Sequence, residues 1–240
     1  MKLGIGSYTF AWAVGVPHHE PDRPMTALEL LDIAQTLGVK VVQIADNLPL
    51  HRLASSELAA LARRADEAGI ELEVGTRGIA PNTIRTYLDL AVRLGSPILR
   101  TITDTADHEP SPDEIVTAVR ASVPALEEAG VTLAIENHDR FTCEALIDLL
   151  RRIDSEHVGI CLDTVNSFGA LEGPERVVET LGPWTVNLHV KDFTITRASH
   201  QMGFSVEGCP AGQGRLDVPG LLNRLRSMNR DVNAILELWR

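Results

Sequence analysis

The chain has 240 residues, 44% of them hydrophobic, and carries 22 Lys and Arg against 33 Asp and Glu, a formal net charge of −11. This length and apolar content fit one large domain with a sizeable core, spanning residues 1–240. The negative charge excludes nucleic acid as an expected partner, because duplex binding requires Lys and Arg to neutralise phosphates. No stretch approaches the roughly 20 apolar residues of a membrane span, so we expect no membrane partner.

The sequence also indicates a compartment. Cys143, Cys161 and Cys209 are odd in number and widely spaced, which favours neither a disulfide framework nor a CxxC zinc site. Residues 1–10 read as a strand and lack the long apolar region of a signal peptide. We therefore expect a cytoplasmic protein with reduced thiols.

Eight short apolar segments predict strands, with centres near Ile5, Val42, Leu72, Leu99, Leu133, Ile160, Val186 and Leu236. Helical periodicity between them predicts helices over 26–37, 55–68, 83–94, 112–129, 143–153, 174–181 and 219–228. Thr26 and Glu29 form a capping box at the first of these helices. This alternation is typical of repeated βαβ units and a parallel sheet. Eight strands favour a single-domain α/β fold, a closed (β/α)8 TIM barrel, over an open sheet.

Three features qualify the predicted barrel. The chain stops at Arg240, shortly after the eighth strand, so the C-terminal helix is expected to be short or missing. Either that helix is missing, or 219–228 already serves the ring and the edge of the first strand is covered in another way, for example by a subunit interface. We expect a homo-oligomer, a dimer or a tetramer. The connections 11–25 and 192–218 are long enough to predict lids or binding loops at the C-terminal face.

Four consecutive predicted strands end in a side chain that can bind a metal: Glu136, Asp163, His189 and Glu237. Each alone is ordinarily a solvated polar group. In a barrel, however, the C-terminal ends of the strands converge on the axis, so the four would share one site. Three carboxylates and one imidazole suit a single Mn²⁺ or Mg²⁺ ion, and Co²⁺ or Zn²⁺ would also fit.

Further residues are predicted around this site. Lys191 lies two residues past His189 and points to the same side of its strand, where it would bind a carboxylate or phosphate or serve as an acid. The alternative for Lys191 is a structural ion pair. Arg100 would pair with an anionic substrate group or form an internal salt bridge. Substrate contacts are also predicted for Tyr8, Trp12, His138 and Asn166. Two interpretations, a structural polar layer of the barrel or a substrate contact, fit equally well for Gln43, Asp46 and Glu73.

Five segments carry a resemblance to a known family: 134–141, 161–166, 187–192, 212–219 and 235–238. Over essentially its whole length the chain resembles the xylose isomerase-like TIM barrel superfamily, the sugar phosphate isomerase/epimerase group. The resemblance implies that Glu136, Asp163, His189 and Glu237 bind one divalent ion and that Glu136 and Glu237 double as an acid/base pair. It implies a metal-dependent isomerase or epimerase that acts on a small sugar or sugar acid through an enediolate.

The chain departs from the ketose 3-epimerase pattern at two positions. Asn166 stands where those enzymes have His, and Ile195 stands where they have Arg. These departures, together with Lys191, favour as an alternative a metal-dependent lyase: a 3-oxo sugar-acid decarboxylase (3-oxo-isoapionate decarboxylase-like) or a dehydratase. Residues 6–12 and 41–50 are similar to decarboxylases of branched sugar-acid catabolism. An abasic-site endonuclease would need further His and Glu ligands, and a barrel that only binds sugar would not need both Glu136 and Glu237.

Overall fold

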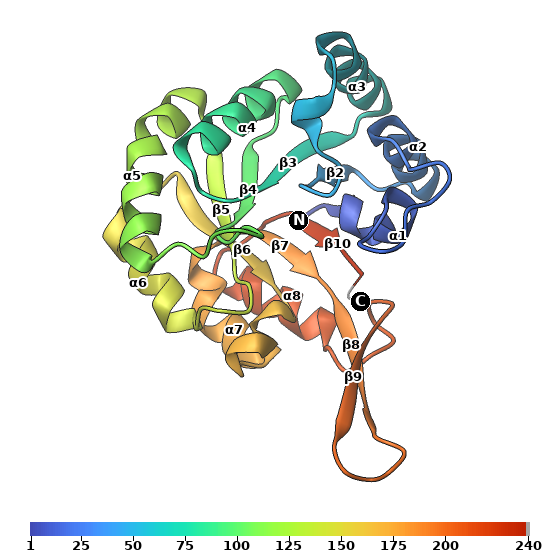
Figure 1. Ribbon diagram of the computed structural model, residues 1–240. Helices are drawn as coiled ribbons and strands as arrows, with labels where there is room; N and C mark the ends of the chain where they lie inside the picture. The colour runs from blue at the N-terminus through green and yellow to red at the C-terminus, as the bar shows by residue number, and fades with distance from the viewer. Residues whose placement is uncertain (239–240) are drawn as a thin grey trace.

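A closed barrel of parallel strands forms the centre of the molecule in the computed structural model, which describes residues 1–238 (Figure 1). Its strands are β1 (Leu3–Gly6), β2 (Val41–Ile44), β3 (Glu71–Arg77), β4 (Ile98–Ile102), β5 (Thr132–Glu136), β6 (Val158–Asp163), β7 (Thr185–Val190) and β10 (Ala234–Leu236). Around the barrel they follow the order β1-β10-β7-β6-β5-β4-β3-β2. All the predicted strands are present, and the predicted (β/α)8 TIM barrel is confirmed.

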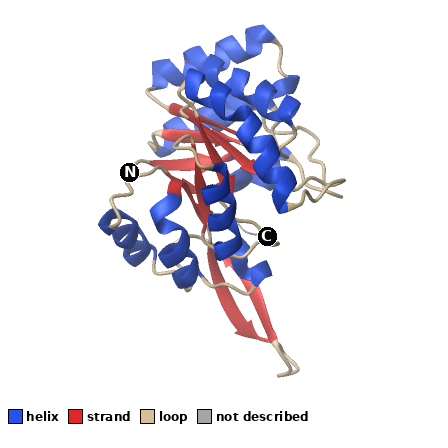
Figure 2. Ribbon diagram, turned by 90° about the vertical axis from the view of Figure 1, so that its left-hand side faces the viewer, coloured by secondary structure: helices blue, strands red, loops and turns tan. Residues whose placement is uncertain are grey.

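Seven helices surround the barrel: α2 (Ala27–Leu37), α3 (Ser55–Ala68), α4 (Pro81–Leu94), α5 (Pro112–Ala129), α6 (Cys143–Ile153), α7 (Pro174–Leu181) and α8 (Val218–Ser227). Figure 2 shows them outside the strands. Short 3-10 turns cover Ser7–Phe10, Leu50–Arg52, Asn166–Ala170 and Gly182–Trp184. The observed helix bounds lie within two residues of the predicted ones. The largest difference is at α4, which begins at Pro81 because proline suits the first helical turn. None of the helices between residues 1 and 238 has the length and apolar content to cross a membrane.

Local sequence signals explain where these helices begin and end. The Thr26 side chain accepts a hydrogen bond from the Glu29 backbone N–H, and the Glu29 carboxylate accepts one from the Thr26 backbone N–H, which confirms the predicted capping box. At the other end Gly38 takes a left-handed conformation with φ of 71°, which a residue with a Cβ adopts at a cost. Between these two ends, Leu30 and Leu31 are buried on the face of the helix that packs against the barrel.

The eighth strand closes the barrel. β10 pairs in parallel with β1 on one side and with β7 on the other, so neither edge is free. In the described part of the chain no helix follows β10, in line with the short or missing C-terminal helix that we expected. An uncovered edge of the first strand is not found, because β1 is hydrogen-bonded to both β10 and β2.

Neither long connection is a loop throughout. The first contains a short helix, α1 (Ala11–Val14), and an isolated bridge between Val16 and His19. The second folds into an antiparallel hairpin, β8 (Asp192–Arg197) with β9 (Phe204–Cys209), that projects from the barrel in both ribbon views (Figures 1 and 2). The predicted long connection 192–218 is therefore regular structure over 192–197 and 204–209, and its role as a lid or binding loop stays a prediction.

Asp192 fixes the segment that returns from the hairpin. Its carboxylate is buried and accepts backbone N–H groups from Phe193 at 2.7 Å and from Gly212, Gly214 and Leu216 at 2.9 Å each. Burial alone would raise the pKa of Asp192, but these backbone donors favour the charged form and lower it below the ordinary value. A Cβ at residue 214 would lie 2.3 Å from Asp192 Oδ1, so this close approach requires glycine.

We expect Asp192→Asn to lower the free energy of unfolding by about 1–3 kcal/mol at neutral pH, because an amide nitrogen would face backbone donors. The pKa of Asp192 is lower in the folded protein than in the unfolded chain. Its contribution is therefore complete above the unfolded pKa of about 3.9 and is lost as the pH falls through the lower folded value. Urea unfolding from pH 7 to pH 3 measures this effect, with the exposed Asp22→Asn as the matched control. Equal unfolding energies for Asp192→Asn and the wild type at pH 7 would contradict the prediction.

Candidate active site

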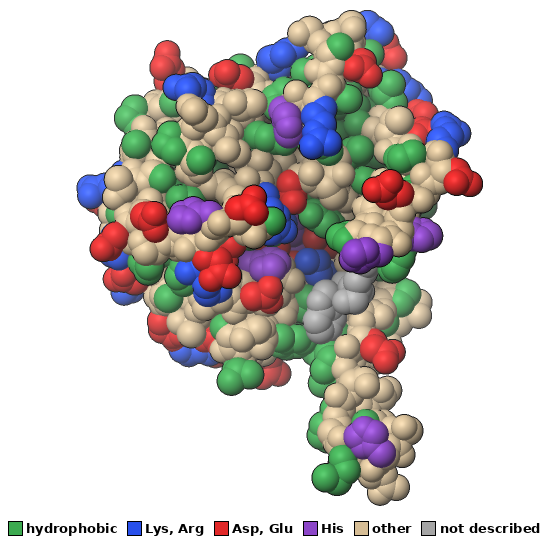
Figure 3. All heavy atoms as spheres, viewed as in Figure 1, with side chains coloured by type: hydrophobic (Ala, Val, Ile, Leu, Met, Phe, Trp, Pro, Cys, Tyr) green, Lys and Arg blue, Asp and Glu red, His purple; other side chains and the backbone are tan. Residues whose placement is uncertain are grey.

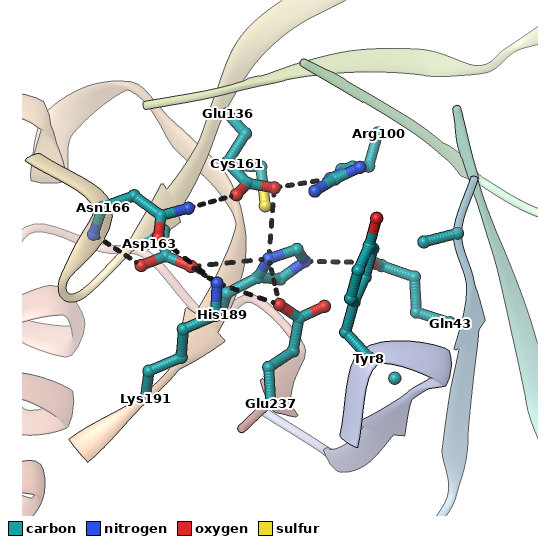
Figure 4. Close-up of polar contacts among 12 residues, drawn as sticks. Tyr8, Gln43, Arg100, Glu136, Cys161, Asp163, Asn166, His189, Lys191 and Glu237 are labelled. Carbon is teal, nitrogen blue, oxygen red and sulfur yellow. Dashed lines mark hydrogen bonds and ion pairs between the residues drawn. The ribbon is translucent and has the colours of Figure 1, made fainter. Parts of the chain in front are cut away.

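Four metal-capable side chains meet at the C-terminal end of the barrel (Figure 4). Glu136 and Asp163 end β5 and β6, His189 lies near the end of β7, and Glu237 directly follows β10. All four are buried, and the most exposed of them, Glu237, is 5% accessible. The structure thus brings together the residues that the sequence singled out from four separate strands.

The imidazole of His189 lies at the centre of this cluster. Its Nδ1 atom is 3.3 Å from Glu136 Oε2, 3.5 Å from Glu237 Oε2 and 3.8 Å from Asp163 Oδ2. One ligand atom each from Asp163, His189 and Glu237 lies within 4.8 Å of the others, as a shared cation would require. The barrel register explains this proximity, because His189 pairs with Asp163 on β6 and with Ile235 on β10.

Three atoms of the cluster are buried without a hydrogen-bond partner among the described residues: Asp163 Oδ2, which meets the Lys191 ammonium in an ion pair, His189 Nδ1 and Glu237 Oε1. Bare acceptors in a buried site are unfavourable unless a donor or a cation satisfies them. Asp163 is oriented by its own backbone, since Oδ1 accepts the N–H groups of Val165 and Asn166 at 2.9 Å. These residues therefore fit a divalent ion of the hard, oxygen-preferring kind.

Both oxygens of Glu136 are already engaged. Oε1 accepts a hydrogen bond from Asn166 Nδ2 at 2.7 Å, and Oε2 accepts one from Arg100 Nε. Burial alone would raise the pKa of Glu136, but the charges of Arg100, His189 and Lys191 lower it well below the ordinary value. Glu136 is therefore held as an anion and is a weak proton acceptor.

Lys191 places an ammonium group beside the same carboxylates. Its Nζ atom lies 2.7 Å from Asp163 Oδ2 and 3.2 Å from Glu237 Oε2, and it also reaches Asn166 Oδ1 at 3.4 Å. Desolvation opposes the charge, but Asp163, Glu237 and Glu136 outweigh it and raise the pKa of Lys191. The ion pair given as the alternative for Lys191 is thus present, and its partners belong to the cluster itself.

Arg100 forms the internal salt bridge that the sequence allowed. Its guanidinium is buried, and besides Glu136 it contacts Asp46 Oδ1 at 3.1 Å and the Thr76 carbonyl at 3.2 Å. Asp46 in turn accepts hydrogen bonds from Arg77 Nε and the Tyr8 hydroxyl, each at 3.1 Å. The pKa of Arg100 is raised well above its ordinary value, because Glu136 and Asp46 outweigh the desolvation of its charge.

The other predicted substrate residues lie nearer the surface. Tyr8 is half-buried beside the cluster in Figure 4, and burial with the neighbouring Asp46 raises its pKa to about 12, so the phenol stays protonated. Trp12 in α1 is 55% exposed and packs edge-on against His19. His138 is partly exposed, with Nδ1 2.9 Å from Asp139 Oδ2. On the face drawn in Figure 3, acidic, basic and His side chains gather around the middle of the molecule.

A cavity of about 550 Å³ is lined by Asp46, His51, Arg77 and Tyr87 among others, and by none of the clustered residues. Asp46 connects it to Glu136 through Arg100. A larger hollow of about 640 Å³ lies between α7 and α8 on the outer ring and contains none of the clustered residues. The smaller cavity is therefore linked to the cluster only through this chain of ion pairs, and the larger hollow has no such link.

No role for Cys161 was predicted from the sequence. Its thiol lies in the same cluster, where one atom each from Glu136, Cys161 and His189 could meet a metal. Burial raises the pKa of Cys161 to about 11, so the sulfur stays protonated and is a poor ligand. Its position in the middle of an apolar strand gave no signal of this proximity.

Comparisons with known proteins agree with this geometry. Residues 31–240 match the family described as the xylose isomerase-like TIM barrel. The chain belongs to this family. Over its whole length it is 34% identical to the 3-oxo-isoapionate decarboxylase of Pectobacterium atrosepticum and covers 86% of that protein. The resemblance inferred from the sequence motifs is thus confirmed at the level of the family.

Two solved structures of the same fold are similar to the whole chain. A D-psicose 3-epimerase, determined in the presence of D-fructose, superposes with a TM-score of 0.78 at 16% identity, and the match covers 85% of it. A xylose isomerase-like TIM barrel protein from Mycobacterium smegmatis, in complex with magnesium, superposes with a TM-score of 0.76 at 14% identity over 90% of its chain. At these identities the family members share the barrel, and the likeness carries no statement about the reaction.

Proposed function

We propose that this protein is a divalent-metal-dependent decarboxylase of a 3-oxo sugar acid. The observation that carries the proposal is the state of Glu136: each of its oxygens accepts a hydrogen bond, from Arg100 or from Asn166, which holds the carboxylate charged and weakly basic while leaving lone pairs for a metal. An epimerase needs two free acid/base groups on opposite faces of one carbon. A decarboxylase needs no carboxylate to remove a proton from carbon. The 34% identity to a 3-oxo-isoapionate decarboxylase over the whole chain supports the same reaction.

The metal would be held by Glu136, Asp163, His189 and Glu237. Their buried, unpartnered atoms and their hard donor set fit Mn²⁺ or Mg²⁺. When bound, such an ion acts as a Lewis acid that stabilises negative charge on a substrate oxygen. Arg100 contributes by holding Glu136 in its charged form, in the orientation that faces His189.

Lys191 would bind the substrate carboxylate that leaves as CO₂. Its ammonium group can pair with the substrate carboxylate at the mouth side of the cluster. The bond between C1 and C2 then breaks, CO₂ leaves, and the electron pair moves into the C2–C3 bond and onto the C3 oxygen. The ammonium next to the vacated carbon supplies the proton to C2 and recovers one from water. A carbanion-like enolate carbon is basic enough to accept this proton even from an ammonium with a raised pKa.

A second candidate is an isomerase or epimerase that works through an enediolate. It is favoured by the presence of Glu237 with an unpartnered Oε1 on the side of the cluster away from Glu136. Glu136, held charged with a lowered pKa, would then be a weak base for one of the two proton transfers. This low basicity places the isomerase behind the decarboxylase.

NMR product analysis in D₂O distinguishes the two. Mg²⁺-loaded protein would be offered a panel of 3-oxo sugar acids and ketoses, with heat-denatured protein as the blank. We expect loss of CO₂ from an acid and one deuterium at the vacated carbon. Deuterium next to a carbonyl with all carbons retained would instead establish the isomerase or epimerase. No turnover of either substrate class would overturn both proposals.

A further inference from the structure

A layer of buried polar side chains lies inside the barrel directly beside His189. It consists of Gln43 on β2, Glu73 on β3 and Asn187 on β7, all fully buried, with the half-buried Asn233 just before β10. Gln43 pairs in register with Glu73, and its side chain crosses the barrel to residues 144 and 146 positions away in the sequence. The mechanism above assigns this layer no role.

The carboxylate of Glu73 sets the direction of every hydrogen bond in the layer. Its Oε2 accepts from Gln43 Nε2 at 2.9 Å and from Asn187 Nδ2 at 2.8 Å, and its Oε1 accepts from Asn233 Nδ2 at 2.8 Å. The second N–H of Gln43 donates to Asn187 Oδ1 at 3.0 Å. A reversed Gln43 amide would place its oxygen against the Glu73 carboxylate and the Asn187 carbonyl, so only one orientation is satisfied.

This orientation aims the Gln43 carbonyl at His189. Gln43 Oε1 lies 2.7 Å from His189 Nε2. A carbonyl oxygen can only accept, so Nε2 must carry a proton. Nδ1 is then the nitrogen whose lone pair a metal would take, and it is the atom that faces Glu136, Asp163 and Glu237. The same hydrogen bond opposes a half-turn of the ring, which would replace Nδ1 by a carbon.

We infer that Gln43, oriented by Glu73 and Asn187, is a positioning residue that fixes the ring and the tautomer of His189 for metal binding through Nδ1. The inference rests on the proposed metal site. A ligating His whose other nitrogen donates to a fixed acceptor is oriented and made more basic as a ligand. Here the acceptor is an amide whose own direction is imposed by a buried carboxylate on a neighbouring strand.

Gln43→Met removes the acceptor and keeps the side-chain volume. We expect its Kd for Mn²⁺, measured by calorimetric titration, to rise by about 10–100-fold. Gln43→Glu restores an acceptor for His189 Nε2 but removes the donors to Glu73 and Asn187. We expect it to bind Mn²⁺ within a few-fold of the wild type. If the layer served stability alone, Gln43→Glu would bind as weakly as Gln43→Met, and the inference would be overturned.

A spectroscopic readout is independent of both variants. In wild-type protein labelled with ¹⁵N-histidine and loaded with Zn²⁺, we expect Nε2 of His189 to carry a slowly exchanging proton and Nδ1 to be the metal-bound nitrogen. Thr185→Val is the matched control, because it removes the buried hydrogen bond from Thr185 to the Leu181 carbonyl away from the cluster. Thr185→Val should leave both readouts unchanged.

The outcomes separate the inference from the metal site. Wild-type protein that binds Mn²⁺ with a proton on Nδ1 and the metal on Nε2 would overturn the role of Gln43 and leave the site intact. A folded Gln43→Met protein that binds Mn²⁺ with the wild-type Kd, or Zn²⁺-loaded wild type with the proton on Nδ1, would overturn the role of Gln43 alone. Wild-type protein that binds no divalent ion would overturn the metal site, and the inference with it.

Discussion

Glu237→Gln is expected to weaken Mn²⁺ binding and to lower kcat/KM for the metal-loaded protein, each on the order of 10³-fold or more, since losing an outer-shell partner alone costs roughly 10–100-fold. Glu237 presents Oε1 without a hydrogen-bond partner among the described residues, and Oε2 lies 3.5 Å from His189 Nδ1. An amide at this position would turn an N–H₂ group towards the cation or towards Lys191. Either orientation removes one negative charge from the ligand set.

The geometry around Glu237 makes this variant a clean test. The Glu237 backbone donates to the Val190 carbonyl at 3.1 Å, and a Cβ at Gly6 would lie 3.0 Å from Glu237 Oε1, so the side chain is closely confined. Gln has the same shape and should fit without repacking. Glu207→Gln on the exposed face of β9 is the matched control and should retain the wild-type Kd and kcat/KM. A Glu237→Gln protein that binds Mn²⁺ as the wild type does would contradict the ligand role.

The positions of the candidate ligands could be predicted because barrel geometry converts a place in the sequence into a place in space. Glu136 and Asp163 each follow an apolar run, and the ends of adjacent parallel strands lie side by side. The sequence therefore located the cluster without any knowledge of side-chain conformation. Helix ends such as Thr26 and Gly38 were predictable for a similar reason, because capping depends on residues only a few positions apart.

The partners within the site could not be predicted in the same way. For Arg100 the sequence left open a substrate contact or a salt bridge. Its pairing with Glu136 and Asp46 depends on side chains from β4, from β5 and from the segment just after β2 meeting inside the barrel. Gln43 and His189 are 146 positions apart, and no local pattern links them. Such pairs follow from the stagger of the closed barrel and from rotamers, which periodicity does not encode.

The hairpin was missed although a local signal for it existed. Residues 194–196 read Thr-Ile-Thr and 204–206 read Phe-Ser-Val, which are strand-forming residues on either side of a turn that contains Gly203. The segment was interpreted as a loop because its glycines and its length outweighed these short runs. The two strands pair with each other through backbone hydrogen bonds, with Asp192 opposite Cys209 at the base and Arg197 opposite Phe204 near the tip.

Lys191→Met is expected to lower kcat for CO₂ release by about 10²–10⁴-fold while leaving divalent-metal affinity unchanged or higher. The ammonium of Lys191 lies on Asp163 Oδ2 and Glu237 Oε2, the oxygens assigned to the metal, so its removal leaves these oxygens to the cation alone. Without a metal, the variant keeps three buried carboxylates, and Arg100 is the permanent cation that remains beside them. We expect the metal-free variant to be less stable than metal-free wild type by about 3–5 kcal/mol.

Two measurements separate this role from a structural one. Thermal unfolding with and without Mn²⁺ should show a larger metal-dependent rise in Tm for Lys191→Met than for the wild type, because the ion replaces the missing charge. Single-turnover release of CO₂ from a 3-oxo sugar acid, measured on the folded, metal-saturated variant, should still be slow. Lys40→Met, which removes an exposed ammonium before β2, is the control for the loss of charge. Lys191 is structural if the saturated variant releases CO₂ at the wild-type rate, and the decarboxylase would then need another proton donor at the vacated carbon.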